Sequence, residues 1–294
     1  DKMIPSMKDT LKEGGLFIVP LAVLTTALIY GFTPTMVGIM GTIAVLAISV
    51  FKAHTRIGII ALAKALSETC YRMVPVAGAC AAAGLIIGGM TMTGLAGKFA
   101  HLVNDLTGSL QFPTLLVTAC LTVVLGLGMP TPSAYILSAA LMTPILTEIG
   151  VATLPAHMFV FYYAVMSALT PPVAVAAYAA SSIAEDNPLL IAVIAVKFAL
   201  AAFIVPFAFV YGPELLFEGP WHIILISLIT AIIGLILISA ALEGFLKTHL
   251  VIWERVIIGV SGFGLLIPNH FAGIISLFLI GTYFVAKKLA RSKK

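Results

Sequence analysis

Apolar segments of roughly membrane-spanning length follow one another along most of this chain. A helix that crosses a bilayer needs about 20 mostly apolar residues, and residues 16–32, 34–51, 73–96, 189–211 and 221–242 approach that length. Of the 294 residues, 61% are hydrophobic and 10% are charged, whereas a soluble domain carries about 25% charged residues. So few charges cannot cover a water-facing surface. We therefore predict an all-α polytopic membrane protein.

Residues 52–72 differ from these spans because their apolar and charged side chains separate onto two faces. Ile59 and Leu62 lie on one face at helical spacing, and Lys64 and Glu68 lie on the opposite face. A helix with this pattern lies in the membrane interface rather than across the bilayer. The sequence therefore predicts an interfacial helix over 52–72, separate from the span that begins at residue 73.

The distribution of basic residues predicts the orientation of the chain. Residues 52–72 contain four Lys or Arg, the last eight residues contain five, and none lies between Lys98 and Lys197. The positive-inside rule places residues 52–72 and the C-terminal tail in the cytoplasm. The spans reach that arrangement only if residues 113–149 enter and leave on the same side, as a re-entrant helical hairpin.

The predicted hairpin is interrupted at residues 126–133, which read GLGMPTPS. Two prolines stop the first helix, and the glycines allow a tight turn. The next helix begins with the hydroxyls of Thr131 and Ser133, and a helix N-terminus carries a partial positive charge that suits a carboxylate. The predicted substrate-binding residues are Gly128, Met129, Pro130, Thr131, Pro132 and Ser133.

A second interruption, at residues 167–173 (SALTPPV), makes the next helix discontinuous. Prolines deprive carbonyls of the preceding turn of their helical donors, and carbonyl and hydroxyl oxygens suit a hard monovalent cation. Transporters hold substrate and coupling ion at paired helix breaks near the midplane. Met129–Ser133 and Thr170–Pro172 can line one small-molecule pocket only if they lie within about 12 Å of each other. The predicted cation-binding residues are Gly126, Ser167, Leu169, Thr170, Pro171 and Pro172.

These two stretches resemble the large membrane subunit of TRAP transporters, the tripartite ATP-independent periplasmic transporters. The resemblance rests on the GMPTPS tip, on PAHMF before the following helix and on TPPV at its break, and it covers about residues 73–217. Beyond residue 221 the chain is similar to the extra C-terminal segment of fused permeases that work with TAXI-type binding proteins.

The resemblance implies an elevator-type secondary transporter of the ion transporter superfamily in the bacterial inner membrane. It would import small organic anions, delivered by a periplasmic substrate-binding protein, together with Na⁺ or H⁺ and without another cofactor. The implied partners also include a small membrane subunit, or its fused equivalent, and the lipid bilayer.

The chain contains one hairpin and one broken helix, whereas the family has two inverted repeats of this pair. It therefore looks like the second half of a permease, and the first repeat would come from another chain or a missing part. We expect scaffold helices and the interfacial helix over 1–97, the transport core over 98–211, and extra membrane helices with the basic tail over 212–294.

Two other classes of function remain as alternatives to a transporter subunit. A membrane-embedded enzyme would need a charged or nucleophilic cluster at depth, and the stretch with both breaks offers mainly hydroxyls. A structural subunit of a larger membrane complex would not need two adjacent breaks. The scattered His and Cys residues show no metal-ligand spacing, and the basic tail is explained by topology, so we expect neither a metal site beyond Na⁺ nor nucleic-acid binding.

Overall fold

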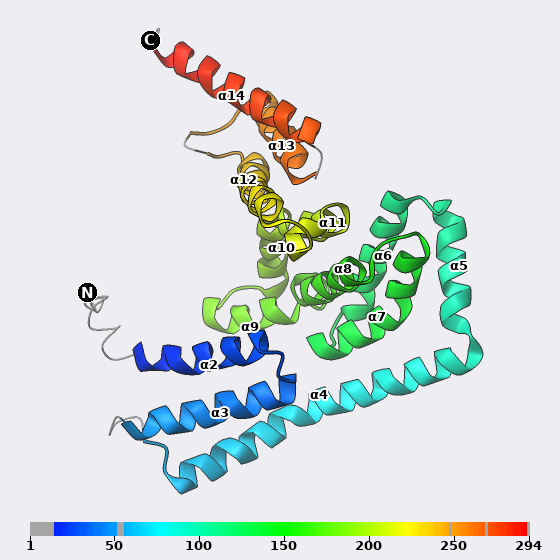
Figure 1. Cartoon of the computed structure of the whole chain (residues 1–294), viewed down its shortest axis with the longest axis vertical. Helices are drawn as coiled ribbons and strands as arrows, with labels where there is room; N and C mark the ends of the chain where they lie inside the picture. Colours follow the sequence, from blue (N-terminus) through cyan, green and yellow to red (C-terminus); the bar gives the residue numbers. More distant parts are fainter. Residues whose placement is uncertain (1–14, 52–55, 247, 268–269, 293–294) are drawn as a thin grey trace. The chain divides into compact units, whose positions relative to one another are not determined.

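The computed structural model describes residues 15–51, 56–246, 248–267 and 270–292. Helices make up nearly all of this part, and none of its residues forms a named strand (Figure 1). The all-α prediction is therefore confirmed. By residue number the elements are η1(Gly15–Phe17), α2(Ile18–Ile29), α3(Pro34–Phe51), α4(Ile59–Thr93), α5(Leu95–Thr107), α6(Gln111–Gly126), α7(Thr131–Glu148), α8(Thr153–Met166), η3(Ser167–Leu169), α9(Val175–Ala184), α10(Pro188–Ala199), η4(Ala202–Ile204), α11(Val205–Tyr211), η5(Pro213–Leu216), α12(Trp221–Glu243), α13(Ile252–Leu266) and α14(His270–Ser292).

The chain divides into two compact units, Asp1–Val74 and Pro75–Lys294. In the first unit α2 packs against α3, and α3 has the bounds that the sequence predicts. Gly41 of α3 allows the close contact, because a Cβ there would lie 3.0 Å from Leu24 Cγ of α2. The boundaries predicted at 97/98 and 211/212 concern function, and they stay predictions.

The predicted separation of an interfacial helix from the third span is wrong. The helix α4 runs without interruption from Ile59 to Thr93 and contains Pro75. No capping residue or glycine ends a helix near Arg72, and a single proline removes only one backbone donor. Arg72 pairs with Glu68 at 2.6 Å on the exposed surface of this continuous helix. Residues 52–55 of the predicted segment lie outside the described part.

The helix α5 lies between the predicted third span and the hairpin, where no helix is predicted from the sequence. Gly94 and Gly108 flank α5, both with positive φ. Ala100, Val103, Asn104 and Thr107 are its buried residues, and their i, i+3, i+4, i+7 spacing was a signal in the sequence.

The main apolar core of the second unit lies between the hairpin helices α6 and α7 and the helix α8 that follows them. These three helices pack against one another, and α8 also packs against α11. Phe159 of α8 is fully buried and meets Phe207 of α11 edge to face at 5.4 Å. Tyr163 of α8 donates a hydrogen bond to the carbonyl oxygen of Phe203. The hairpin therefore rests on a rigid aromatic layer.

The clean span predicted over 189–211 is wrong, because this segment forms α10, η4 and α11 in succession. Pro206 lies in the first turn of α11. It cannot donate to the carbonyl of Ala202 in η4, and the α-helical conformation already ends before it, at Leu200 and Ala201. The pair α9 and α10 is also bent, by 115°.

The C-terminal helices follow the sequence prediction more closely. The helix α12 matches the span predicted over 221–242, with one added residue, and it packs against α13, which in turn packs against α14. The sequence of 251–286, which is interrupted by Pro268-Asn269-His270, predicts two short helices, but α14 has 23 residues and is not short. The proposed interruption at Pro268 and Asn269 lies outside the described part.

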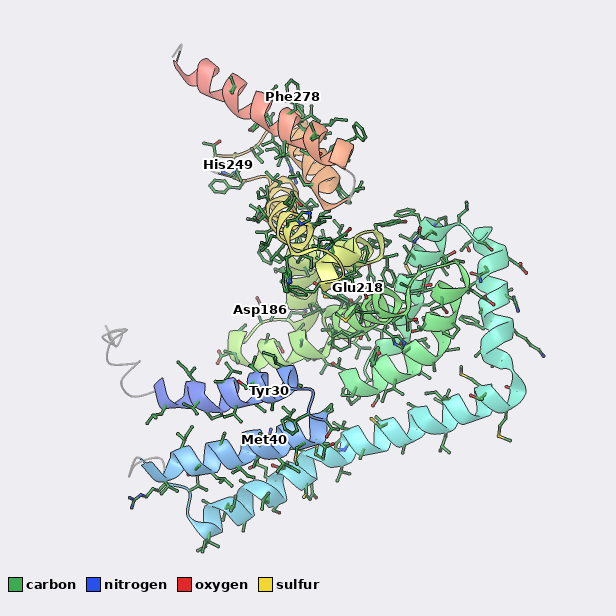
Figure 2. The ribbon with its side chains drawn as sticks, in the orientation of Figure 1. Tyr30, Met40, Asp186, Glu218, His249 and Phe278 are labelled. Atoms are coloured by element: carbon green, nitrogen blue, oxygen red, sulfur yellow. The ribbon has the colours of Figure 1, made fainter. Side chains whose placement is uncertain are left out.

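Large apolar side chains also cover the outer surfaces of the helices (Figure 2). Phe278 of α14 is 70% exposed, and Tyr30, after α2, is 78% exposed. By length and composition α4 and α12 can each cross a membrane, and the bent pair α9 and α10 makes a third span if counted as one. This apolar exterior agrees with a polytopic membrane protein.

Candidate functional site

The first helix break separates α6 from α7 at the tip of the hairpin. Gly128 has φ +76°, a left-handed conformation that a side chain would strain. No side chain caps α7, whose first backbone hydrogen bond runs from Ala134 N–H to the Pro130 carbonyl. The N–H groups of Thr131 and Ser133 therefore remain for another partner at the positive end of the helix dipole.

Carbonyl groups at this tip are also left without backbone donors. Among the described residues, no backbone N–H donates to the carbonyl of Leu127, Gly128 or Met129, whereas Gly126 accepts from Met129 N–H at 3.2 Å. The tip is partly exposed at Met129, Pro130 and Thr131. It thus presents both backbone donors and acceptors.

The second helix break follows α8 and the 3₁₀ turn η3. The prolines alone predict that the Ser167 carbonyl is free. In the structure it is paired, because Thr170 N–H donates to it at 3.1 Å. In the described structure the carbonyls of Leu169, Pro171 and Pro172 accept no backbone hydrogen bond. The free acceptors thus lie both before the prolines, at Leu169, and at the prolines themselves.

Both hydroxyls of the second break donate their protons within their own helix. Ser167 Oγ donates to the Ala164 carbonyl at 2.7 Å, and Thr170 Oγ1 donates to the Met166 carbonyl at 3.0 Å. The oxygen lone pairs remain available after the proton is donated. These hydroxyls are therefore suited to contact a cation rather than to donate to an anion.

The two breaks lie against each other. A Cβ added at Gly126 would lie 2.8 Å from Ser167 Cβ, closer than real side chains approach. A Cβ at Gly128 would lie 3.4 Å from Val173 Cγ1. Only glycine at position 126 lets the end of α6 approach η3 this closely. The roles assigned to individual residues stay predictions.

Ser133 has a different environment from the rest of its predicted group. Its side chain is fully buried, and its Oγ lies 3.2 Å from Cys80 Sγ of α4. The hydroxyl therefore fixes the first turn of α7 against α4. Its backbone N–H, one of the uncapped donors, is the group better suited to a ligand.

The sequence did not single out a row of buried hydroxyls along the hairpin. Thr118 and Thr122 of α6 and Ser138 of α7 are fully buried, and their hydroxyls have no hydrogen-bond partner within the described structure. Thr114, Thr118, Thr122 and Gly126 recur every four residues, so they follow one face of α6 toward the break. That spacing was the available signal.

The sequence places His157 at the start of the broken helix, which predicts a hydrogen bond at the helix end rather than a role in proton relay. Its Nδ1 instead lies 2.9 Å from the Tyr135 hydroxyl, which connects α8 with α7. The residue therefore links the hairpin to the broken helix. Tyr135 was not singled out in the sequence.

Acidic and metal-binding side chains play no visible part at these breaks. Across the described residues, no three His, Cys, Asp or Glu side chains gather as metal ligands. A cation at the second break would depend on carbonyl and hydroxyl oxygens, which are the ligands that hard cations prefer.

Comparison with known proteins gives one match. The family described as "Tripartite ATP-independent periplasmic transporter, DctM component" matches residues 1–216 of the 294. No curated protein and no solved structure matches the chain. The matched residues include both helix breaks, while α12, α13 and α14 lie beyond them.

Proposed function

Because the chain belongs to the DctM family of TRAP transporter membrane components, we propose that it imports small organic anions together with a monovalent cation. Membership in this family makes the chain a component of a secondary transporter, and the family is not an enzyme family. The proposal adds the substrate class, carboxylates, and the coupling ion, Na⁺ or H⁺. The contact between Gly126 and Ser167 carries it, since it joins the two breaks.

We assign the anion to the first break, at Gly128, Met129, Pro130, Thr131, Pro132 and Ser133. The uncapped N–H groups of α7 and its dipole support this role. No Lys or Arg lies between Lys98 and Lys197. The negative charge of the substrate would therefore be balanced by the helix end and by the co-bound cation.

We assign the cation to the second break and the adjoining end of α6, at Gly126, Ser167, Leu169, Thr170, Pro171 and Pro172. The oxygen lone pairs of Ser167 and Thr170 and the free carbonyls support this role. A cation next to the anion would raise the affinity of each ligand for the site, because such coupling is reciprocal.

The proposed setting is the bacterial inner membrane, with the C-terminus in the cytoplasm. The proposed partners are a periplasmic substrate-binding protein, the first-repeat half of the permease, and a small membrane subunit or its fused equivalent. The basic residues of the segment 52–72 and of the C-terminal tail support this orientation.

The experiment is uptake of radiolabelled carboxylates by proteoliposomes that contain the assembled permease and its binding protein. We expect uptake to require an inward Na⁺ or H⁺ gradient and to stop when that gradient is collapsed. Uptake that continues without either gradient, at the same rate, would reject cation coupling.

A further inference from the structure

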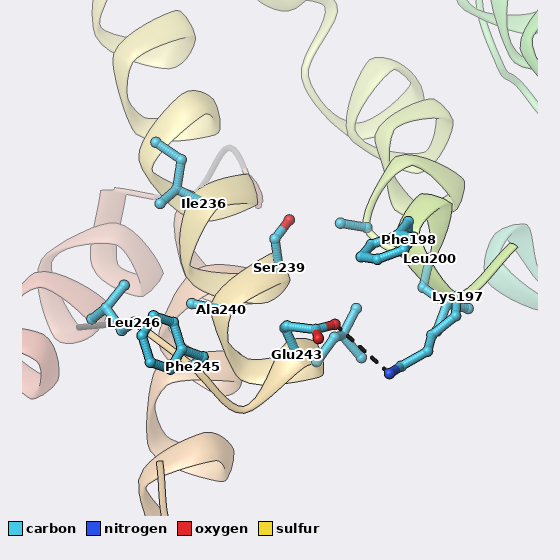
Figure 3. A pocket seen from close by; sticks show the side chains of 11 residues that line it. Lys197, Phe198, Leu200, Ile236, Ser239, Ala240, Glu243, Phe245 and Leu246 are labelled. Carbon is cyan, nitrogen blue, oxygen red and sulfur yellow. Dashed lines mark ion pairs between the residues drawn. The ribbon is translucent and has the colours of Figure 1, made fainter. Parts of the chain in front are cut away.

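A cavity of about 420 Å³ lies between the C-terminal ends of α10 and α12 (Figure 3), and no residue of the two helix breaks lines it. Most of its wall is apolar, and charged side chains stand at one end. The lining residues are Lys197, Phe198, Leu200, Ala201, Ile236, Ser239, Ala240, Leu242, Glu243, Phe245 and Leu246.

The charged end of the cavity consists of one cation and one anion. Lys197 Nζ lies 3.8 Å from Glu243 Oε2, and the two side chains are 59% and 51% exposed. An ion pair this long and this exposed is weak. Each charge can therefore exchange its partner for a ligand group of opposite sign at little cost.

The position along α12 gives the depth of the cavity in the membrane. Glu243 is the last residue of α12, which is long and apolar enough to cross the bilayer. Ile236 lies seven residues earlier, or about 10 Å along the helix axis. The charged end thus lies where a membrane span ends, at headgroup depth, and the apolar wall extends toward the hydrocarbon.

We propose that this cavity binds a phospholipid with a phosphoethanolamine headgroup. Lys197 binds the phosphate and Glu243 accepts hydrogen bonds from the primary ammonium, while Phe198 and Ile236 contact the upper part of an acyl chain. An anionic headgroup brings a negative charge next to Glu243 without a compensating ammonium. A choline headgroup has no N–H to donate. The pair of opposite charges therefore selects ethanolamine.

The lipid would also connect a part of the chain that matches the transporter family with a part that lies beyond this match. Lys197 lies within the residues matched by the transporter family, and Glu243 lies beyond them. A headgroup held by both charges keeps the end of α10 next to the C-terminal helices.

The test uses the full chain, stripped of lipid in detergent and titrated with phosphatidylethanolamine, phosphatidylcholine or phosphatidylglycerol of identical acyl chains. Native mass spectrometry measures the bound lipid. We expect phosphatidylethanolamine to bind most tightly. Lys197→Met should weaken it about tenfold, since a charged hydrogen bond is lost, and Glu243→Gln should abolish the preference over phosphatidylglycerol.

The matched controls are Lys98→Met and Glu218→Gln, which remove exposed charges outside the cavity. They should leave lipid binding unchanged, and thermal unfolding identifies any variant that has lost its fold. Equal binding of the three lipids by the wild-type chain overturns the proposal, as does unchanged selectivity in Glu243→Gln. A photocrosslinker in place of Phe198 should label lipid in membranes, and labelling of protein alone also overturns it.

Discussion

Two regions of the second unit use glycine to bring helices together, and they do so in different settings. In the region of the two helix breaks, Gly126 at the end of α6 faces Ser167. In the C-terminal region, Gly234 of α12 and Gly262 of α13 face each other, and a Cβ at either would lie 2.8 Å from the backbone oxygen of the other. The approach is comparably close in both.

The regions differ in what surrounds the close contact. The helices α12 and α13 are continuous, so their backbone groups are paired within the helices, and the glycines serve van der Waals packing. The helices α6 and α8 end at their contact, where the carbonyls of Leu127 and Leu169 lack backbone donors. A close approach between continuous helices thus favours stability, and one between helix ends favours a binding site.

The largest expected effect comes from adding a methyl group at the contact between the breaks. Gly126→Ala should abolish cation-coupled uptake, because the new Cβ separates the end of α6 from Ser167. The loss is measured as cation-coupled uptake by proteoliposomes. Gly88→Ala is the control, since nothing lies within 4 Å of a Cβ there. Equal losses in both variants would contradict the special role of the break.

Removing an oxygen ligand from the proposed cation site should give the next largest effect. Thr170→Val removes a hydroxyl oxygen, and we expect the cation concentration for half-maximal uptake to rise about tenfold. Thr91→Val is a matched control, because Thr91 also donates to the carbonyl four residues earlier but lies on the exposed surface of α4. If both variants shift equally, the effect belongs to the helix and not to a cation ligand.

In the C-terminal region, a methyl group added to a glycine at the helix contact should lower the stability of the protein and leave uptake unchanged. Gly262→Ala should lower the free energy of unfolding by about 1–3 kcal/mol through overpacking. Uptake per folded molecule should remain near wild type. Denaturation in detergent measures the change, with Gly273→Ala as the uncrowded control. A large loss of cation-coupled uptake in Gly262→Ala would contradict the proposed difference between the two regions.

Ser133→Ala should have the smallest effect. Its hydroxyl contacts Cys80, and the backbone N–H is the group proposed for the substrate. Loss of one such contact costs about 1 kcal/mol, so the substrate concentration for half-maximal uptake should change less than about fivefold. A far larger shift would show that the hydroxyl itself contacts the anion.

Much of the fold could be predicted from the sequence because single residues determine where a helix ends. The prolines at 130, 132, 171 and 172 and the glycines at 126 and 128 located both breaks. Continuity was harder to predict. The amphipathic pattern before Arg72 changes to an apolar one without a residue that stops the helix, so one helix was read as two.

The contact between the breaks was expected only through the resemblance and the general behaviour of transporters. A single sequence gives no distances between residues that are far apart in the chain. The role of Gly126 is therefore clear only from its contact with Ser167 in the structure. The cavity at Lys197 could not be foreseen either, because Glu243 lies 46 positions later and no short-range pattern joins them.

The most direct test of the account is equilibrium binding of ²²Na⁺ to the purified, assembled permease. The central claim is that the cation site exists because the end of α6 lies against η3. The account predicts that Gly126→Ala loses saturable, Thr170-dependent binding while Gly88→Ala keeps it, with both variants folded. Wild-type ²²Na⁺ binding by Gly126→Ala would contradict the claim.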